Sequence, residues 1–485
     1  MTTKLRIFSA DDQLAFARLS GDYNPIHLDA VAARRLLFGQ PVVHGMHALL
    51  WALDAWLEGS LVPIRLKRLK AKFRSSIPLN VAVELVTHDK SSHVTHDKSS
   101  HEVQLELLSD EVKVASVMAA FESSSEPATR IDAPILRELP PEEACRNRSP
   151  ADLQTVVGQF PLCLEAAARL FPNAANLVPE DQLAALLATT RVVGMEAPGL
   201  HSILAGFDLQ DPASTSASGG RAELRYQTDS YDERVSRLEL RVTSSGFEGT
   251  VTAFVRPEPQ RQSSFADLRA LVAIDEFRGE RALVIGGSRG LGELVVKLLA
   301  TGGADVAFTY QRGAADAERL TAEIAADGGA VFSFAYDVLA DAARLPTLAE
   351  GRAPTLLCYF ATPFISASAP RRFNFERFQD FSRYYIDGFL KTFHAARVQG
   401  NSLRSVLYPS SAFVDELPLN MGEYATAKAA GESVCHFLQK AHPEIRFQCP
   451  RLPRLATDQT ATLIRTDLPD PTPILLAQLR QLRTK

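Results

Sequence analysis

The sequence is poor in the features that mark special classes of protein. It has only 5 cysteines in 485 residues, and Cys145, Cys163, Cys358, Cys435 and Cys449 form neither close pairs nor a metal-ligand spacing. This pattern predicts reduced thiols in a cytoplasmic protein and no disulfide framework. With 52 basic against 57 acidic residues, no charge excess points to nucleic acid or to an anionic membrane. No apolar run reaches the length of a membrane span, and the first residues lack the apolar core of a signal peptide.

The chain is also too long for one hydrophobic core. A length of 485 residues suggests roughly three units. Residues 122–150 and 256–278 are rich in proline and polar or charged residues, which is typical of linkers. We therefore expect domains at 1–125, 150–257 and 278–470.

The segment Gly-Asp-Tyr-Asn-Pro-Ile-His, residues 21–27, places an acid and an imidazole five residues apart. Pro25 removes a backbone donor and restricts the residue before it, so we expect a bent, non-helical loop that turns Asp22 and His27 inward. A carboxylate and an imidazole near one substrate carbon can move protons in both directions. The alternative is an Asx turn with a buried structural histidine.

A helix start follows at Val-His-Gly-Met, residues 43–46, ahead of an apolar run to Leu57. Its free N–H groups and positive dipole end suit a carbonyl oxygen that gains negative charge. The pattern G-D-Y-N-P-I-H with a downstream H-G-M resembles the MaoC-like, (R)-specific enoyl-thioester hydratases of hotdog fold. The resemblance implies that Asp22 and His27 handle the water and the α-proton, and that the Gly45 amide polarises the thioester carbonyl.

The order of elements in this first part recurs further along the chain. Both parts have helical segments followed by four alternating, strand-like segments. The stretch V-G-M-E-A-P-G-L-H-S, residues 193–202, resembles the second halves of double-hotdog dehydratases, which implies an α+β double hotdog. The second half lacks its own G-D-x-N-P-x-H, so we expect it to complete the substrate tunnel only. His201 is then a structural histidine rather than a catalytic one.

Residues 87–94 and 95–102 are near-identical copies of T-H-D-K-S-S-H. Their four histidines invite a metal site, but histidine count alone does not make a closed coordination shell. A tandem duplication that lengthens a surface hairpin explains the repeat better. We expect no metal.

The C-terminal part has the pattern of a doubly wound α/β Rossmann domain with a parallel sheet. A buried strand at 281–285 leads into Gly-Gly-Ser-Arg-Gly-Leu-Gly, residues 286–292, and then a helix, so the backbone can approach a pyrophosphate at the helix start. The next strand ends in Tyr-Gln-Arg, residues 310–312, without an acid for a ribose hydroxyl. Arg289 and Arg312 could pair with a 2′-phosphate, which favours NADP over NAD; the alternative is two solvent-facing arginines.

Tyr424 and Lys428 lie four apart in a predicted helix, so the ammonium can lower the phenol pKa. With Ser411 thirteen residues earlier, the pattern resembles the short-chain dehydrogenases/reductases. The resemblance implies that Tyr424 protonates the carbonyl oxygen, Ser411 binds it and Lys428 contacts the ribose. The cofactor-binding residues expected are Gly286, Ser288, Arg289, Gly290, Leu291, Gly292, Arg312, Asp337, Val338, Ala361, Tyr424, Lys428 and Thr457.

This part departs from the family pattern at three places. Ala361-Thr362-Pro363 replaces the usual Asn-Ala-Gly, and Pro450-Arg451 replaces the usual Pro-Gly. The helix position of a proton-relay asparagine is assigned to Asp387. These departures bear on the relay and the substrate loop, whereas Ser411, Tyr424 and Lys428 are intact.

The two resemblances join adjacent reactions. They predict a bifunctional enzyme in which an NADP-dependent 3-ketoacyl-thioester reductase supplies a 3-hydroxyacyl-thioester dehydratase, as in fatty-acid or polyketide synthesis. The substrates would be acyl carrier protein or coenzyme A thioesters, with neither nucleic acid nor membrane as partner and a homodimer through the reductase as one assembly. The alternatives are hydration followed by oxidation, as in β-oxidation, and a scaffold with one inactive half that binds acyl carrier protein.

Overall fold

A computed structural model describes most of the chain: residues 3–35, 38–89, 101–123, 143–164, 167–212, 222–340, 345, 351–365, 367, 370–460, 462–463 and 466–483. The chain divides into two compact units. The first comprises residues 1–258 with 462–465, and the second comprises 259–461 with 466–485. Of the histidine-rich repeat, residues 90–100 lie outside the described residues.

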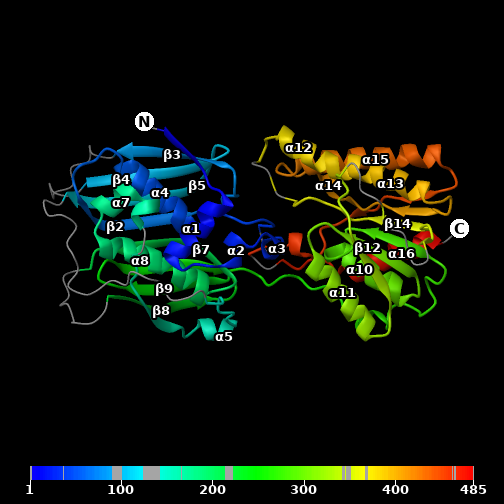
Figure 1. The fold of residues 1–485 in the computed structure, drawn as a ribbon, viewed down its shortest axis with the longest axis horizontal. Coiled ribbons are helices and arrows are strands. Elements are labelled where there is room, and N and C mark those ends of the chain that lie inside the picture. Colours follow the sequence, from blue (N-terminus) through cyan, green and yellow to red (C-terminus); the bar gives the residue numbers. More distant parts are fainter. Residues whose placement is uncertain are drawn as a thin grey trace. The chain divides into compact units, whose positions relative to one another are not determined.

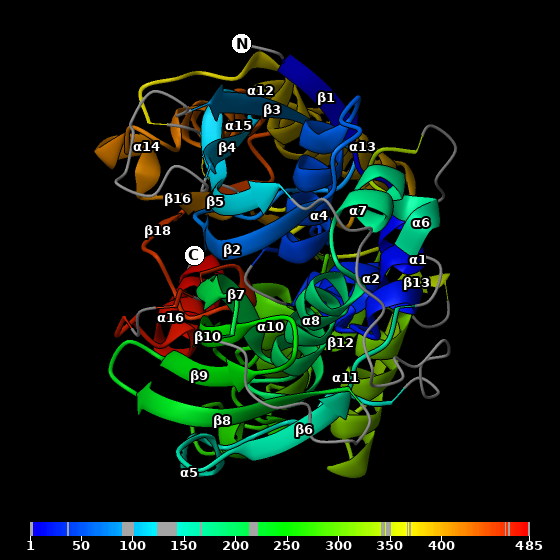
Figure 2. The same cartoon turned by 90° about the vertical axis from the view of Figure 1, so that its left-hand side faces the viewer.

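The first unit is built on one ten-stranded antiparallel sheet with the order β1-β3-β4-β5-β2-β7-β10-β9-β8-β6. The first five strands along the sheet have the same order, counted from the junction outward, as the last five: β2-β5-β4-β3-β1 and β7-β10-β9-β8-β6. Two halves of similar topology therefore meet at the β2–β7 pair. Figure 2 shows β5, β2, β7, β10, β9 and β8 following one another across the sheet. The strands are β1 (Thr3–Ile7), β2 (Ile64–Phe73), β3 (Ala82–Asp89), β4 (His101–Ser109), β5 (Val112–Ser123), β6 (Val157–Pro161), β7 (Ser202–Gln210), β8 (Glu223–Asp232), β9 (Arg237–Thr243) and β10 (Glu248–Val255).

In each half, one long buried helix precedes the strand that lies at the β2–β7 junction. Helix α4 leads to β2, and helix α8 leads to β7 through the π-helix η1. Both helices are buried on nearly every face and share one hydrophobic core with the sheet. Helix α4 is apolar on nearly all its faces, whereas α8 also buries polar side chains such as Gln182 and Thr190. The helical segments are α1 (Ala10–Ser20), α2 (Pro25–Leu28), α3 (Ala30–Ala33), α4 (Gly45–Leu57), α5 (Pro150–Leu153), α6 (Ala167–Leu170), α7 (Pro172–Leu177), α8 (Glu180–Arg191) and η1 (Val192–Glu196).

The prediction of a non-helical loop around Pro25 is wrong in its second half. Pro25 opens the short helix α2, which carries His27, and the Asn24 side chain caps this helix by accepting from the Ile26 N–H at 3.1 Å. Proline is tolerated there because the first residue of a helix needs no N–H donor and has the φ that proline fixes. The edge strands β1 and β6, at the two ends of the sheet, were not predicted at all.

The second unit has a six-stranded parallel sheet with the order β13-β12-β11-β14-β15-β17. This is the 3-2-1-4-5-6 order of a doubly wound Rossmann sheet, with helices packed on it as Figure 1 shows. Its strands are β11 (Arg281–Ile285), β12 (Asp305–Tyr310), β13 (Val331–Ala335), β14 (Leu356–Tyr359), β15 (Ser405–Leu407) and β17 (Arg446–Gln448), with β16 (Ser410–Ser411) and β18 (Arg451–Leu452) as a separate pair. Its helical segments are α9 (Phe265–Leu268), α10 (Gly290–Thr301), α11 (Ala314–Ala326), α12 (Phe375–Ser382), η3 (Arg383–Gly388), α13 (Phe389–Val398), α14 (Phe413–Glu416), α15 (Gly422–Ala441), η4 (Asp458–Thr460) and α16 (Pro471–Arg483).

Part of the stretch predicted as the second linker belongs to this unit. Phe265, Leu268, Val272 and Phe277 are buried in its core. All five cysteines of the chain are free thiols. Among the described residues, no helix combines the length and apolar character needed to cross a bilayer.

Candidate functional sites

The Asp22 side chain is held in the interior of the first unit. Helix α1 ends at Gly21, whose φ of 74° is left-handed and favours glycine, and the chain then turns inward. Asp22 is only 2% exposed, and its Oδ2 accepts the Thr190 hydroxyl at 2.8 Å. Its Oδ1 accepts the Asn24 N–H at 3.3 Å. The carboxyl group is thus buried with two hydrogen-bond donors.

Two imidazoles face this carboxyl group. The rings of His27 and His44 stack with centroids 3.7 Å apart, and the donor atoms of Asp22, His27 and His44 lie within 4.8 Å of one another. His27 Nδ1 lies 2.8 Å from the Val42 carbonyl oxygen. Since both ring nitrogens of His44 already face oxygens, of Gln13 at 2.9 Å and of the Asp22 backbone at 3.0 Å, the trio is not a ready set of metal ligands.

Burial shifts these titrating groups in opposite directions. It raises the pKa of Asp22 to about 7, although the hydrogen bonds from Thr190 and Asn24 oppose the rise. It lowers the pKa of His27 to about 4 and holds that of His44 well below its usual value. An acid and a base whose pKa values are pushed apart are a signature of proton-transfer sites.

The expected oxyanion donor lies beside this pair. Gly45 is the first residue of α4, so its N–H has no acceptor within the helix. The Phe73 ring packs against it, since a Cβ at Gly45 would lie 3.1 Å from Phe73 Cε1. Gly45 follows His44, whose ring stacks on His27, so the start of α4 lies next to Asp22 and His27.

The second half of the sheet closes the site from the other side. Thr190 lies at the end of α8, and a Cβ at Gly194 in η1 would collide with the Asp22 carboxylate. Asn24 Nδ2 donates to the Gly194 carbonyl oxygen at 2.9 Å. The sequence motifs do not predict roles for Thr190, Gly194 and His44, and no local motif marks the first two. His201 is buried, and its backbone oxygen accepts from the Arg256 N–H at 2.6 Å, consistent with a structural role.

In the second unit, the predicted cofactor residues follow successive parallel strands. The glycine turn follows β11, Arg312 follows β12, Asp337 and Val338 follow β13, and Ala361 follows β14. The carboxyl ends of parallel strands share one edge of the sheet, which is where such folds bind ligands. Gly286 has a φ of 75°, and a Cβ there would lie 2.9 Å from the Phe360 carbonyl carbon, so the turn needs glycine on both grounds. Thr457 lies beyond β18, with its N–H donating to Thr460 Oγ1 at 2.9 Å.

Ser411, Tyr424 and Lys428 converge near the same edge. Tyr424 is buried, and burial raises its pKa to about 12, while a hydrogen bond with Ser411 acts in the opposite direction. The expectation that Lys428 lowers this pKa is not met. The Lys428 ammonium instead donates to the Pro409 carbonyl oxygen at 2.8 Å and lies 3.9 Å from the Tyr385 ring centroid, and burial lowers its pKa to about 7.

The assignment of the relay position to Asp387 is also wrong. Asp387 is exposed on η3, whereas Tyr385 of the same π-helical turn is buried against Lys428. The Tyr385 hydroxyl lies 2.6 Å from that of Thr362, in the altered loop after β14. A π-helix changes the helical phase, so residue counting selected the wrong side chain.

Arg451, which stands where the family pattern usually has glycine, is paired with Glu432. Arg451 donates to both carboxylate oxygens of Glu432, at 2.9 and 2.7 Å, and Glu432 also accepts the Ser410 hydroxyl. This network ties the β16–β18 pair to α15, next to Ser411.

Comparison with known proteins finds matches in both units of the chain. A family model described as MaoC like domain matches residues 2–111, and one described as short chain dehydrogenase matches residues 280–352. The N-terminal part of the chain is therefore similar to MaoC-like domains, and part of the C-terminal unit is similar to short-chain dehydrogenases. An (R)-specific enoyl-CoA hydratase of Aeromonas caviae is 46% identical over 56 residues, 12% of this chain and 40% of that protein. A mitochondrial 3-hydroxyacyl-[acyl-carrier-protein] dehydratase of Arabidopsis thaliana is 46% identical over 41 residues, 8% of this chain and 25% of that protein.

These alignments span well under two thirds of either curated relative. Solved structures resemble the short-chain dehydrogenase domain. A short chain dehydrogenase from Burkholderia cenocepacia in complex with NADP is 24% identical, covers 38% of this chain and 77% of its own, and has a TM-score of 0.33. A putative short chain dehydrogenase from Pseudomonas syringae is 18% identical, covers 44% of this chain and 92% of its own, and has a TM-score of 0.37.

Proposed function

We propose that this chain reduces a 3-ketoacyl thioester with NADPH and dehydrates the resulting (R)-3-hydroxyacyl thioester to a trans-2-enoyl thioester. The observation that carries the proposal is the pairing of the buried Asp22 with the half-buried His27 near the start of α4, with pKa values shifted in opposite directions. In this proposal residues 1–125 and 150–257 are two hotdog halves with one dehydratase site, and the reductase follows from 278. Coenzyme A and acyl carrier protein are the carriers in the names of the two curated relatives.

The dehydration uses His27 as base and Asp22 as acid. With a pKa of about 4, His27 is neutral near pH 7, and its Nδ1–H donates to the Val42 oxygen, which leaves Nε2 as the basic nitrogen. Nε2 takes the α-proton, which the thioester carbonyl makes acidic, and the C–H electron pair forms the double bond. The Asp22 carboxyl group gives its proton to the 3-oxygen, which leaves with the C–O pair as water. The Gly45 N–H and the α4 dipole stabilise the enolate oxygen.

The glycine turn of the second unit fits a pyrophosphate. A Cβ at Gly290 would meet nothing within 4 Å, so there is open space at the start of α10, whereas a Cβ at Gly292 would collide with the Gly286 carbonyl oxygen beneath it. Arg289 and Arg312 would hold a 2′-phosphate, which favours NADP and, with it, the reductive direction. When bound, NADPH supplies the hydride.

The chain's own groups supply the proton and the orientation for this reduction. A pKa of about 12 keeps the Tyr424 phenol protonated, so that it can donate to the carbonyl oxygen of the 3-ketoacyl group. The Ser411 hydroxyl holds the same oxygen. Lys428 donates to the Pro409 carbonyl oxygen, and its ammonium would contact the ribose of a bound cofactor.

The test supplies acetoacetyl thioester with NADPH or NADH and follows cofactor oxidation and enoyl formation separately. Tyr424→Phe should abolish NADPH oxidation but leave the dehydration of added (R)-3-hydroxybutyryl thioester. Asp22→Asn and His27→Asn should do the reverse. A wild-type chain that oxidises no NADPH with any thioester would refute the reductase, and unchanged enoyl formation in both loop variants would refute the dehydratase.

A further inference from the structure

The shorter of the two hydrogen bonds on the Asp22 carboxyl group comes from the other half of the sheet. The Thr190 hydroxyl donates to Asp22 Oδ2 at 2.8 Å, against 3.3 Å for the Asn24 N–H on Oδ1. Thr190 and Asp22 are 4% and 2% exposed, so water does not replace this bond easily. A charge-assisted hydrogen bond in a buried site restrains its acceptor more strongly than a neutral one.

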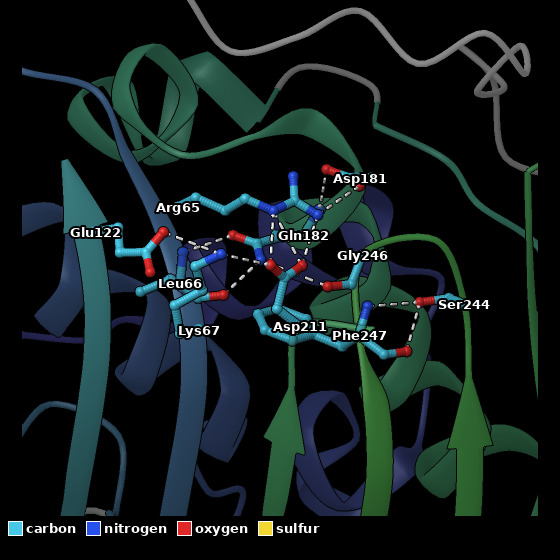
Figure 3. A network of polar contacts seen from close by, with 10 residues as sticks. All are labelled: Arg65, Leu66, Lys67, Glu122, Asp181, Gln182, Asp211, Ser244, Gly246 and Phe247. Atoms are coloured by element: carbon cyan, nitrogen blue, oxygen red, sulfur yellow. Dashed lines mark hydrogen bonds and ion pairs between the residues drawn. The ribbon is translucent and has the colours of Figure 1, made fainter. Parts of the chain in front are cut away.

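The helix that carries Thr190 is fixed to the first half at its other end. Gln182, near the start of α8, is fully buried and makes two hydrogen bonds with one residue of β2: Oε1 accepts the Leu66 N–H at 3.0 Å and Nε2 donates to the Leu66 oxygen at 2.7 Å. Beside it, Arg65 of β2 bonds to Asp211 at 2.6 Å and lies 3.8 Å from Asp181 of α8, as Figure 3 shows. The N-terminal end of α8 is therefore hydrogen-bonded to β2, and Thr190 near its C-terminal end is hydrogen-bonded to the Asp22 carboxyl group.

The π-helix η1, which follows α8, also contacts the segment that carries Asp22. The absent side chain of Gly194 leaves room for the Asp22 carboxylate, and the Gly194 oxygen accepts from Asn24 Nδ2 at 2.9 Å. The Tyr23 N–H points to the Met195 sulfur at 3.2 Å. The loop that carries the acid is thus shaped by residues about 170 positions later in the chain.

We propose that Thr190 is a positioning residue that orients the Asp22 carboxyl group for proton transfer, so that the second half, whose sequence has no G-D-x-N-P-x-H motif, is part of the active site. This inference rests on the proposed dehydratase function. The Thr190 hydroxyl donates most strongly to the ionised carboxylate of Asp22. This hydrogen bond therefore lowers the pKa of Asp22, whereas burial raises it.

Other titratable groups face Asp22 and would stay in place in a Thr190 variant. His27 and His44 lie on the first-half side, and Arg191 of α8 packs against Gly21, whose Cβ would lie 3.0 Å from Arg191 Cδ. A change seen on removing the hydroxyl alone therefore reports the Thr190–Asp22 bond.

The test compares Thr190→Val, which keeps the shape but loses the hydroxyl, with Thr190→Ser, which keeps the hydroxyl. Thr189→Val is the matched control. Thr189 is also buried on α8, but its hydroxyl donates to the backbone oxygen of Ala185 in the same helix, at 2.8 Å, and not to Asp22. In the full chain, with trans-2-butenoyl thioester and water, we expect Thr190→Val to lower kcat about tenfold at unchanged KM. The pH-profile limb due to Asp22 should move up by about one unit. Thr190→Ser and Thr189→Val should follow the wild type.

A second measurement does not need activity. In urea unfolding, Thr190→Val should reduce the folding equilibrium constant about tenfold more at pH 8.5 than at pH 5, and this difference should vanish when Asp22→Asn is also present. A pH-independent effect of Thr190→Val, or an equal effect of Thr189→Val, would overturn the inference. A wild-type chain that hydrates no enoyl thioester would instead refute the proposed function, while unfolding would still decide whether Thr190 acts on Asp22.

Discussion

Replacement of Asp22 by asparagine should stabilise the first unit while removing dehydration. Burial raises the pKa of this carboxyl group from 3.8 to about 7. A carboxyl group with a raised folded pKa contributes stability that is fully present below the unfolded pKa and is lost as the pH rises through the folded one. The wild type therefore loses stability between about pH 4 and pH 7, and Asp22→Asn does not.

The magnitude follows from the size of the shift. A shift from 3.8 to about 7 corresponds to about 4 kcal/mol at 1.36 kcal/mol per pH unit, and the full difference is reached only above pH 7. The nearby histidines titrate in both proteins, so their contributions largely cancel in the comparison. At pH 4 the variant and the wild type should be nearly equal in stability.

Urea unfolding of the full chain between pH 4 and pH 9 provides the measurement, read on the transition of the first unit. Asp208→Asn is the control of opposite sign: Arg68 and Lys70 hold the pKa of Asp208 at about 2, so its removal should destabilise the unit at neutral pH. If Asp22→Asn is no more stable than the wild type between pH 5 and pH 8, burial does not raise the pKa of the Asp22 carboxyl group as described above.

Three further outcomes are expected. Gly194→Ala should push its new methyl group into the Asp22 carboxylate and slow dehydration about 10²-fold with NADPH oxidation unchanged; equal loss of both activities would point to misfolding instead. His47 is buried against aromatic rings, and burial lowers its pKa to about 3. The free energy of unfolding should therefore fall as the pH drops below 6.5, where the unfolded chain binds a proton at His47. In urea, the wild type should lose about 2 kcal/mol more than His47→Phe between pH 7.5 and pH 5. An identical acid response in this variant would contradict that account. Arg451→Gly should leave the buried Glu432 carboxylate without its bidentate partner and lower the thermal midpoint of the second unit, whereas an unchanged midpoint would show that the pair is dispensable.

Local spacing predicted the parts of the sites that lie close together in sequence. Asp22 and His27 are five residues apart, and Tyr424 and Lys428 share a helix face at four apart, so short-range geometry brings each pair together. The glycine turn between β11 and α10 was predictable for the same reason. The Asp387 assignment failed where a π-helix changes the phase of the helix and turns Tyr385 inward instead.

The sequence by itself determined which chemistry each part of the chain carries, because motif residues and their spacing define the reacting groups and the helix starts that serve them. Only the tertiary structure decided how those groups are tuned. Thr190 meets Asp22 across 168 positions because α8 is anchored on β2, and no local pattern encodes that contact. The pKa shifts of Asp22, His27 and Tyr424 follow from burial, which belongs to the packed fold and not to the order of the residues.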